Sequence, residues 1–233
     1  MSDERARWDA YLWGPGGWVL RNKWGIRDQL TLDLAEHGET KRREREIARG
    51  KVEIPRTYDG AHLRAIHAHL FGNVYEWAGE YRTVGMQKGA SPESAFAPPE
   101  HIGRYVGYAR RVVEETDWAS LDPEAFADTS ARVFAYINHA HPFREGNGRT
   151  SRIFMEHVSE RTSYRFRFEK LDPETWNMAS RLSGPADPFG EPDPRPLESV
   201  FRKATQELSV SPAKAFGRDA ETLRALWARG RGR

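Results

Sequence analysis

Small and apolar side chains recur every three or four positions after Asp122 and Pro123, which places them on one face of a helix. Asp122 and Pro123 suit the start of such a helix, because Asp caps unpaired backbone N–H groups and Pro needs no N–H there. The face consists of Phe126, Ser130, Val133, Phe134 and Ile137. Since a stripe of this length has to be covered by other elements, we predict a buried central helix.

Other segments also have helical patterns. Residues 31–50 carry alternating charges, which favours one or two exposed helices that end at Gly50. Residues 57–72 combine an N-terminal capping residue with an apolar stripe, and residues 197–208 can form a further helix. The segment 183–196 between these helices holds five prolines and is predicted to be a loop.

Patterns typical of strands are few. Residues 80–89 and 94–99 can pair as a hairpin, and residues 164–169 alternate like an exposed edge strand. The sequence therefore predicts an all-α, mainly helical domain with a small β-hairpin.

The composition narrows the class of protein. Of 233 residues, 38% are hydrophobic and 30% are charged, which is typical of a soluble chain with a real core. The 36 basic residues nearly balance the 34 acidic ones, so nucleic acid is not expected as a partner. There is no cysteine, which excludes disulfides and thiolate metal sites. No apolar run approaches the roughly 18 residues of a membrane span, and no signal peptide begins the chain. A cytoplasmic protein without a membrane partner is expected.

Directly after the predicted central helix, the segment 137–152, INHAHPFREGNGRTSR, contains histidine, acidic, glycine and arginine residues close together. Gly146 and Gly148 break that helix and permit a tight turn into a second helix that begins near Gly148. Unpaired N–H groups at a helix N-terminus bind anions, and a phosphate is the usual guest. Arg149 and Arg152 add two guanidinium groups suited to phosphate oxygens.

Two further residues fit the same chemistry. Glu145 would repel a phosphate unless a cation lay between them, and Mg²⁺ can bridge a carboxylate and a polyphosphate. His141 can accept the proton of an attacking nucleophile, because its unperturbed pKa is close to neutral. Phe143 is predicted to anchor the loop in the core. Taken singly, a loop histidine, two helical arginines and a GNG turn usually have structural roles, so their combination carries the interpretation.

The segment 141–152, HPFREGNGRTSR, resembles the signature of the Fic family, HxFx[D/E]GNGRxxR, with no departure. Residues 62–89 resemble the first core helix and the flap of that family, and residues 20–26 resemble its lead-in. The resemblance covers about residues 20–201. It predicts a Fic domain over residues 1–208, with an N-terminal aromatic and helical extension and a core at about 55–182, followed by a basic tail at 209–233.

The resemblance implies an adenylyltransferase that moves AMP from ATP to a Ser, Thr or Tyr hydroxyl of a target protein. In this interpretation His141 is the general base, Glu145 binds Mg²⁺, and Arg149 and Arg152 hold the β- and γ-phosphates. The phosphates would be cradled by the backbone N–H groups of Gly146, Asn147 and Gly148, with the Asn147 side chain assisting. The flap that binds the target by strand addition would comprise Thr83, Val84, Gly85, Met86, Gln87 and Lys88.

Several other activities stay open. Doc kinases of the same fold have a lysine where Gly148 stands and lack the second arginine, Arg152, so adenylyl transfer is favoured over phosphorylation. Phosphocholine transfer is compatible with the motif. A nucleotide-binding scaffold without activity is disfavoured by the intact set of polar residues. A metal hydrolase could use His67, His69, His139 or His141, although no H-E-x-x-H motif is present.

Many Fic proteins carry an inhibitory helix with the motif [S/T]xxxE[G/N]. The chain has Thr40 four residues before Glu44 and Ser120 four residues before Glu124, but neither Glu is followed by Gly or Asn. We therefore expect a separate small antitoxin as inhibitor, which makes the chain a toxin of a toxin–antitoxin pair or an effector delivered to another cell. An unusual internal brake, or none, is the alternative.

The N-terminal aromatic residues offer one candidate surface for such an inhibitor. They are Trp8, Tyr11, Trp13 and Trp18. Packing against the core is the more ordinary use of such residues.

Overall fold

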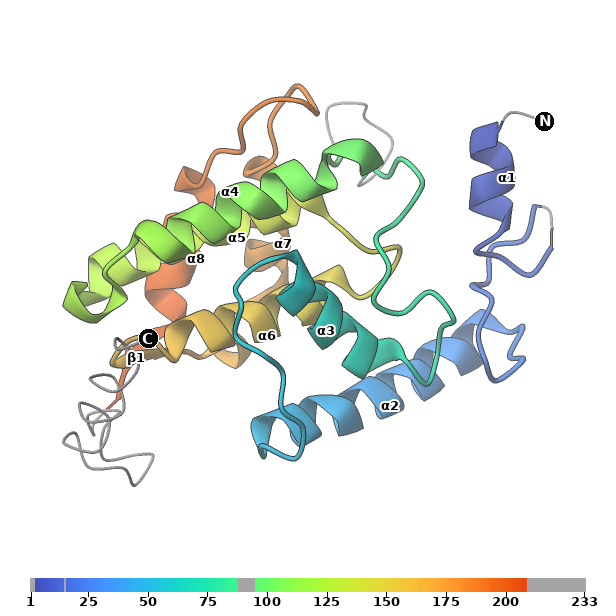
Figure 1. Cartoon of the computed structure of the whole chain (residues 1–233), viewed down its shortest axis with the longest axis horizontal. Coiled ribbons are helices and arrows are strands. Elements are labelled where there is room, and N and C mark those ends of the chain that lie inside the picture. The colour runs from blue at the N-terminus through green and yellow to red at the C-terminus, as the bar shows by residue number, and fades with distance from the viewer. Residues whose placement is uncertain (1–2, 15, 88–94, 209–233) are drawn as a thin grey trace, which may run out of the picture.

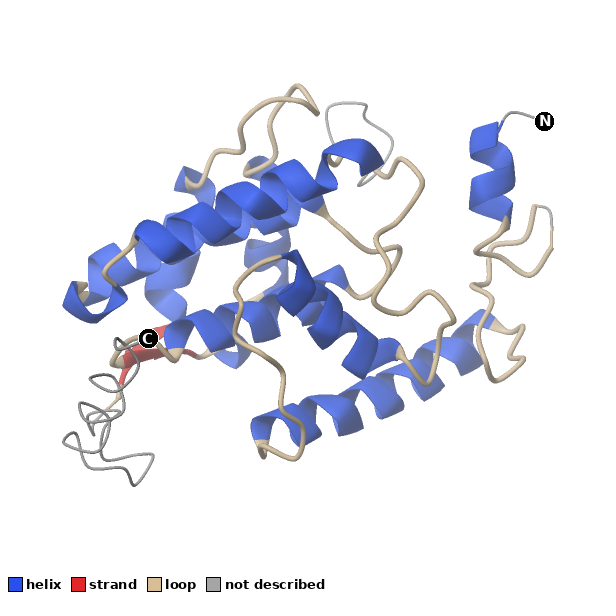
Figure 2. Cartoon of the chain, viewed as in Figure 1, coloured by secondary structure: helices blue, strands red, loops and turns tan. Residues whose placement is uncertain are grey.

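Helices make up nearly all of the regular structure in the computed structural model, which describes residues 3–14, 16–87 and 95–208 (Figure 2). The α-helices of the described residues are α1 (Asp3–Asp9), α2 (Gln29–Ala48), α3 (Gly60–Phe71), α4 (Ile102–Glu115), α5 (Pro123–Ala140), α6 (Asn147–Ser159), α7 (Pro173–Leu182) and α8 (Arg195–Ala204). Short 3-10 helices lie at η2 (Pro99–His101), η3 (Trp118–Ser120) and η4 (Phe168–Lys170). The predicted mainly helical fold is confirmed.

The predicted central helix is α5. Asp122 accepts a hydrogen bond from the Ala125 N–H at 2.8 Å and Pro123 occupies the first turn, as the sequence indicates. Every member of the predicted stripe is buried, from Phe126 to Ile137. The helix packs against α4, α6 and α8, and in Figure 1 α4 runs alongside it. The motif loop therefore begins at the end of the best-covered helix of the fold.

Helices α2 and α3 form a second layer beside α6. Helix α2 is one continuous helix that ends at Ala48, and Figure 1 shows it below α3. Most of its surface is exposed, but Leu32, Glu36 and Thr40 are buried on one face. Helix α3 is capped by Asp59 and packs against both α2 and α6. One face of α2 is thus directed at the start of α6.

The strands differ from the prediction. Of the expected hairpin, the described residues contain a single antiparallel bridge between Gln87 and Ala95, and residues 88–94 lie outside the described part of the chain. The two-stranded sheet instead joins β1 (Tyr164–Phe166) to β2 (Thr205–Glu207), antiparallel. The predicted helix at 197–208 is therefore wrong after Ala204. Pairing with β1 satisfies the backbone of β2, and Phe166 packs against Phe126 and Phe201.

Candidate active site

The motif loop connects α5 to α6 and is closed by Asn147. Its Oδ1 accepts from the Phe143 N–H at 2.9 Å, and its Nδ2 donates to the Phe143 carbonyl at 2.7 Å. Phe143 is fully buried and stacks on His67 at 3.9 Å, so the predicted anchoring role is confirmed. Both polar atoms of the Asn147 side chain therefore bind the loop backbone, and Nδ2 keeps a second N–H, so the expected assistance of this side chain in phosphate binding stays a prediction.

His141 occupies the first position after α5 in a left-handed conformation, with φ at 40°. Its N–H donates to the Ile137 carbonyl, which closes the last helical turn. Its ring stacks on Phe96 at a centroid distance of 3.7 Å. Since Phe96 donates its N–H to the Met86 carbonyl, the imidazole lies directly beside the flap.

Arg82 holds the flap and the motif loop together, a role that the sequence analysis missed. Only 2% of it is exposed. Its guanidinium donates to the carbonyls of His141 (2.8 Å), Val84 (2.6 Å) and Ala140 (3.2 Å) and to that of Ala97. Burial lowers the pKa of Arg82 to about 10, which still leaves it charged at neutral pH. One buried cation thus fixes the backbone on both sides of His141.

The N-terminus of α6 has the geometry of an anion site. Gly146 precedes it with φ at 81°, and a Cβ there would lie 2.2 Å from the Phe71 ring, so only glycine fits. The Thr150 N–H bonds to the Gly146 carbonyl, which leaves the N–H groups of residues 147–149 without intrahelical partners. A Cβ at Gly148 would meet nothing within 4 Å.

The two motif arginines lie one turn apart on α6 in different environments. Arg149 donates from Nη2 to Glu36 at 2.7 Å and from Nη1 to Thr40 at 3.0 Å. Arg152 is partly exposed and makes no hydrogen bond or ion pair with the residues that the structure describes. Both arginines line two cavities, of about 700 and 460 Å³, beside α2.

Glu145 is suitably placed for a cation beside a bound polyphosphate. Its Oε1 accepts from the Gly146 N–H at 2.8 Å and from Arg149 at 3.3 Å, while Oε2 accepts nothing from the described residues. Its side chain is 43% exposed. Within the described ranges no three His, Cys, Asp or Glu residues form a metal cage. A single carboxylate fits Mg²⁺, which proteins often bind through one or two carboxylates together with substrate phosphates and water.

The flap residues lie over a groove of about 760 Å³ that is also lined by α1 and Phe189. Thr83 is already engaged, because its carbonyl accepts from Arg7 and its N–H donates to the Tyr11 hydroxyl. The N–H groups of Val84, Gly85 and Met86 have no partner in the described structure. Of the flap residues named from the sequence, Lys88 lies outside the described residues.

The remaining histidines do not converge on a metal site. His67 receives the Gly79 N–H on Nδ1 and donates from Nε2 to the Glu145 carbonyl, and burial lowers its pKa to about 3. His69 faces Glu46, and His139 contacts the Pro188 carbonyl. The metal-hydrolase alternative therefore finds no support in the described residues.

Neither candidate brake forms an ion pair with Arg152 within the described residues, although Glu44 lines the same cavity as Arg152. Glu44 pairs with Lys41 on its own helix at 2.7 Å. Glu124 lies 3.5 Å from Arg202 at the start of α5. The segment of residues 40–44 contributes to the site in another way, since Thr40 binds Arg149.

The N-terminal aromatic residues mostly pack against the protein. Tyr11 is in the core, Trp8 and Trp13 are partly buried, and Arg144 lies 4.7 Å above the Trp8 ring. Trp18 is the exception, with 83% of its surface exposed. Core packing is thus confirmed for three of the four residues.

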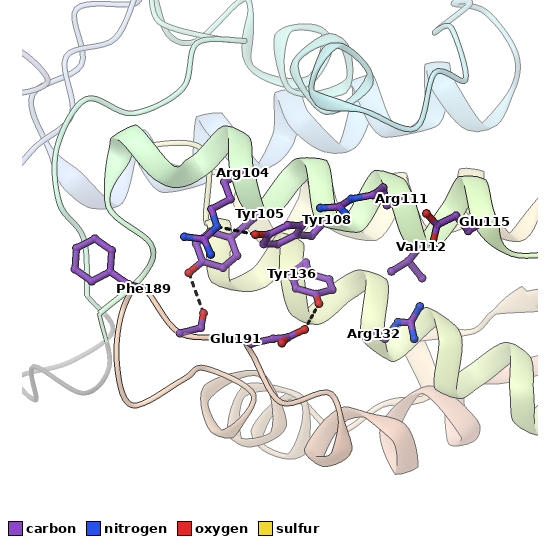
Figure 3. A pocket seen from close by; sticks show the side chains of 11 residues that line it. Arg104, Tyr105, Tyr108, Arg111, Val112, Glu115, Arg132, Tyr136, Phe189 and Glu191 are labelled. Atoms are coloured by element: carbon purple, nitrogen blue, oxygen red, sulfur yellow. Dashed lines mark hydrogen bonds between the residues drawn. The ribbon is translucent and has the colours of Figure 1, made fainter.

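A further cavity lies away from the motif. It has a volume of about 410 Å³ and is lined by α4, α5 and the loop at residues 189–191. Figure 3 shows Arg104 bonded to Tyr108, and Glu191 bonded to Tyr136. No motif residue lines this cavity, so it is separate from the candidate site.

The contacts that build the site come from residues that are distant in sequence. Glu36 and Arg82 were not singled out from the sequence. Thr40 was considered only as part of a brake motif, and His67 only as a possible metal ligand. The sequence holds one usable signal: Leu32, Glu36 and Thr40 follow a spacing of four, which puts an acid on the buried face of α2. Arg82 has no comparable signal.

Comparisons with known proteins agree with this geometry. The Fic/DOC family model matches residues 57–159. A probable protein adenylyltransferase, Fic, of Escherichia coli (strain K12) is 30% identical over 203 residues, which are 87% of this chain and 95% of that protein. The probable protein adenylyltransferase y4lH of Sinorhizobium fredii is 38% identical over 180 residues, 75% and 89% of the two chains.

A solved structure shares the fold. The N-terminal Fic domain of a Bartonella quintana cell filamentation protein, a VirB-translocated effector with bound ADP, superposes with a TM-score of 0.72 at 28% identity. The match covers 86% of this chain and 96% of that domain. In the described part of our chain, no helix combines the length and apolarity needed to cross a membrane. The intact motif, its geometry and these relatives together show that the chain belongs to the Fic/DOC family.

Proposed function

We propose that this chain is a protein adenylyltransferase, which transfers AMP from ATP to a Ser, Thr or Tyr hydroxyl of a target protein. The observation that carries the proposal is the complete HPFREGNGRTSR motif, folded into one loop that joins His141 to an uncapped helix N-terminus. The two relatives above are named probable protein adenylyltransferases, and ADP is bound in the related Bartonella quintana domain.

In this function the start of α6 binds the nucleotide phosphates. The backbone N–H groups of Asn147, Gly148 and Arg149 point out of the helix end, and Arg149 and Arg152 line the adjoining cavities. Glu145 would hold Mg²⁺, which neutralises phosphate charge when it is bound. Asn147 would contribute its backbone N–H and the second N–H of Nδ2, while its other amide contacts close the loop.

His141 is the proposed general base. The target hydroxyl oxygen attacks the α-phosphorus, pyrophosphate leaves, and the hydroxyl proton passes to the imidazole. The left-handed backbone at His141 and the Arg82 bonds to the Ala140 and His141 carbonyls fix the ring beside the flap. This geometry would present the base to a hydroxyl delivered along the flap.

The flap is the proposed docking edge for the target. Because Thr83 is occupied and Val84 is buried, strand addition would use a backbone N–H that faces the groove, from Gly85 or Met86. The groove of about 760 Å³ beside these residues leaves room for an extended segment.

The test uses ATP labelled separately at the α- and γ-phosphates, with a cell lysate as the source of targets. We expect label from α-labelled ATP on a protein band, only with Mg²⁺, and none from γ-labelled ATP. The reverse pattern would establish the Doc-like kinase, and label from neither with intact nucleotide binding would favour phosphocholine transfer or a scaffold. Glu145→Ala should weaken Mg²⁺-dependent binding and transfer together.

We also propose that the enzyme acts in the cytoplasm and that a separate small antitoxin inhibits it. The observation in its favour is the cavity of about 700 Å³ between α2 and α6, where Arg152 has no bonded partner within the described residues. A helix in this cavity could pair a glutamate with Arg152 and occupy the space of the γ-phosphate. Titrating the purified chain with a co-expressed partner should suppress α-label transfer. An Arg152→Ala variant that is inhibited equally would oppose this mode of contact.

A further inference from the structure

Glu36 is a buried acidic residue of α2 and lies outside the motif of residues 141–152. It is 8% exposed, and both of its carboxylate oxygens are engaged. Oε1 accepts from Arg149 Nη2 at 2.7 Å, and Oε2 accepts from the Tyr75 hydroxyl. Burying a charge is costly unless it is paired and hydrogen-bonded, and here both conditions are met.

These contacts restrain the guanidinium of Arg149 at both of its terminal nitrogens. Nη2 is held by Glu36, Nη1 donates to Thr40 at 3.0 Å, and the Phe71 ring lies 4.6 Å from the guanidinium carbon. Thr40 in turn donates to the Glu36 carbonyl at 2.9 Å. Arg149 therefore has little rotational freedom before any ligand binds.

Arg152 provides the contrast within the same helix. It lines the same two cavities as Arg149, yet none of the described residues forms a hydrogen bond or ion pair with it. An arginine fixed in advance loses less side-chain entropy when it binds a ligand, whereas an unrestrained one loses more. Before a ligand binds, the Arg149 side chain is thus held in place by its neighbours, whereas the Arg152 side chain is not.

We propose that Glu36 is a positioning residue for nucleotide binding: with Thr40 and Tyr75 it orients Arg149 so that the remaining guanidinium N–H groups meet the ATP phosphates. The inference rests on the proposed function and deepens it. Tyr75 supports the arrangement as a lasting donor, because burial and the Glu36 charge raise the pKa of its hydroxyl. The pair is charge-assisted. A guanidinium has five N–H donors, and Arg149 uses one each for Glu36, Thr40 and Glu145, so two stay available for a phosphate.

Glu36→Gln is the central variant, because it keeps the shape and removes the charge. We expect its affinity for a non-hydrolysable ATP analogue with Mg²⁺, measured by calorimetry, to fall about tenfold or more. The KM for ATP in α-label transfer should rise similarly, with a smaller change in kcat. Tyr75→Phe should show a weaker effect in the same direction. Glu39 lies one turn along the helix and is paired with Arg42 and Asn73 instead of Arg149, so Glu39→Gln should bind as the wild type does.

A double mutant of Glu36 and Arg149 distinguishes a positioning role of Glu36 from a general effect of its loss on the fold. In an Arg149→Ala background, Glu36→Gln should cause less than about a twofold further loss of affinity, because the residue that it positions is gone. Glu36→Asp should recover part of the affinity, and it replaces Glu36→Gln if the latter does not fold.

Two results would overturn the inference while leaving the proposed function intact. In a wild type that binds the analogue and transfers label, unchanged affinity of folded Glu36→Gln would show that Glu36 has no positioning role. Tighter binding or faster transfer by that variant would show that Glu36 withholds Arg149 and acts as a brake. A wild-type chain that binds no nucleotide would instead remove the proposed function, and this inference with it.

Discussion

At the scale of single residues, His141 combines a chemical role with an unfavourable backbone. Its φ of 40° lies in the left-handed region, where glycine costs less than any residue with a Cβ. We expect His141→Gly to be more stable than His141→Ala by about 1 kcal/mol in urea unfolding, although both lose transfer by about 100-fold or more. Both should retain nucleotide binding. An alanine variant that is fully active would show that another group takes the proton.

Replacing Gly146 or Gly148 by alanine should affect stability in opposite ways. A Cβ at Gly146 would strike the Phe71 ring at 2.2 Å on a backbone with φ at 81°, whereas one at Gly148 meets nothing within 4 Å. Gly146→Ala should therefore lose about 2 kcal/mol or more of unfolding free energy. Gly148→Ala should be as stable as the wild type or slightly more so, because it lies within a helix. Equal stabilities in thermal unfolding would contradict this account.

At the scale of elements, a histidine pair joins α3 to α6. His62 Nε2 and His157 Nδ1 are 2.8 Å apart, and both rings are buried. Burial lowers the pKa of each to about 3, well below the ordinary value of a histidine, which is about 6.5. The native state thus keeps them neutral while the unfolded chain takes up protons. Their stabilising contribution is complete above about pH 6.5 and is lost as the pH falls toward 3.

This linkage can be measured between pH 6.5 and 5, where most carboxylates stay ionised. Glu156 is the exception, because burial raises its pKa to about 7 and its protonation in the folded state opposes the effect of the histidines. Comparing the wild type with a histidine variant removes this contribution, since both proteins contain Glu156. The free energy of unfolding of the wild type should decline with falling pH, with each buried histidine contributing up to about 1.4 kcal/mol per pH unit. His157→Gln, which cannot be protonated, should decline less steeply than the wild type. Parallel curves in urea unfolding would show that His157 is not neutral in the folded state.

A change in the flap should impair modification of the target protein without changing the affinity for nucleotide. Val84 is in the core, so Met86, whose N–H has no partner among the described residues, is the better site for a proline. Met86→Pro should reduce α-label transfer about tenfold relative to Met86→Ala, which keeps the donor. Affinity for the ATP analogue should be equal in the two variants. If Met86→Pro lost affinity for the ATP analogue as strongly as it lost transfer, the flap would be shown to bind the nucleotide and not the target.

The sequence predicted those elements whose signals are local. Helix α5 and the motif loop were found because an N-cap, an apolar period and two glycines are contiguous. Helix α4 was missed although Ile102, Tyr105, Val106 and Ala109 share a face, and this periodicity could have revealed it. Strand β2 could not be found, because only its pairing with β1, about 40 residues away, stabilises it. The role of Arg82 could not be predicted either, because its acceptors in the motif loop are distant from it in the sequence.

At the scale of the whole molecule, the N-terminal segment supports the site from outside the family match. Arg7 donates to the Thr83 carbonyl at 3.1 Å, Tyr11 contacts Thr83 through its hydroxyl, and Trp8 covers Arg144. Helix α1 also stands apart from the helical core in Figure 1. Its visible contacts therefore hold the flap and do not reach Arg152.

Removing residues 1–19 consequently separates two models of regulation. If inhibition comes from a separate partner, the full-length chain expressed alone should transfer label, and the truncated chain should transfer less because Thr83 and Arg144 lose their contacts. Nucleotide affinity should change little, since Glu36, Arg149 and the start of α6 are untouched. Calorimetry and α-label transfer on both proteins give the comparison, and removal of residues 209–233 provides a second truncation. An inactive full-length chain that either truncation activates would locate the brake within the chain and refute the separate inhibitor.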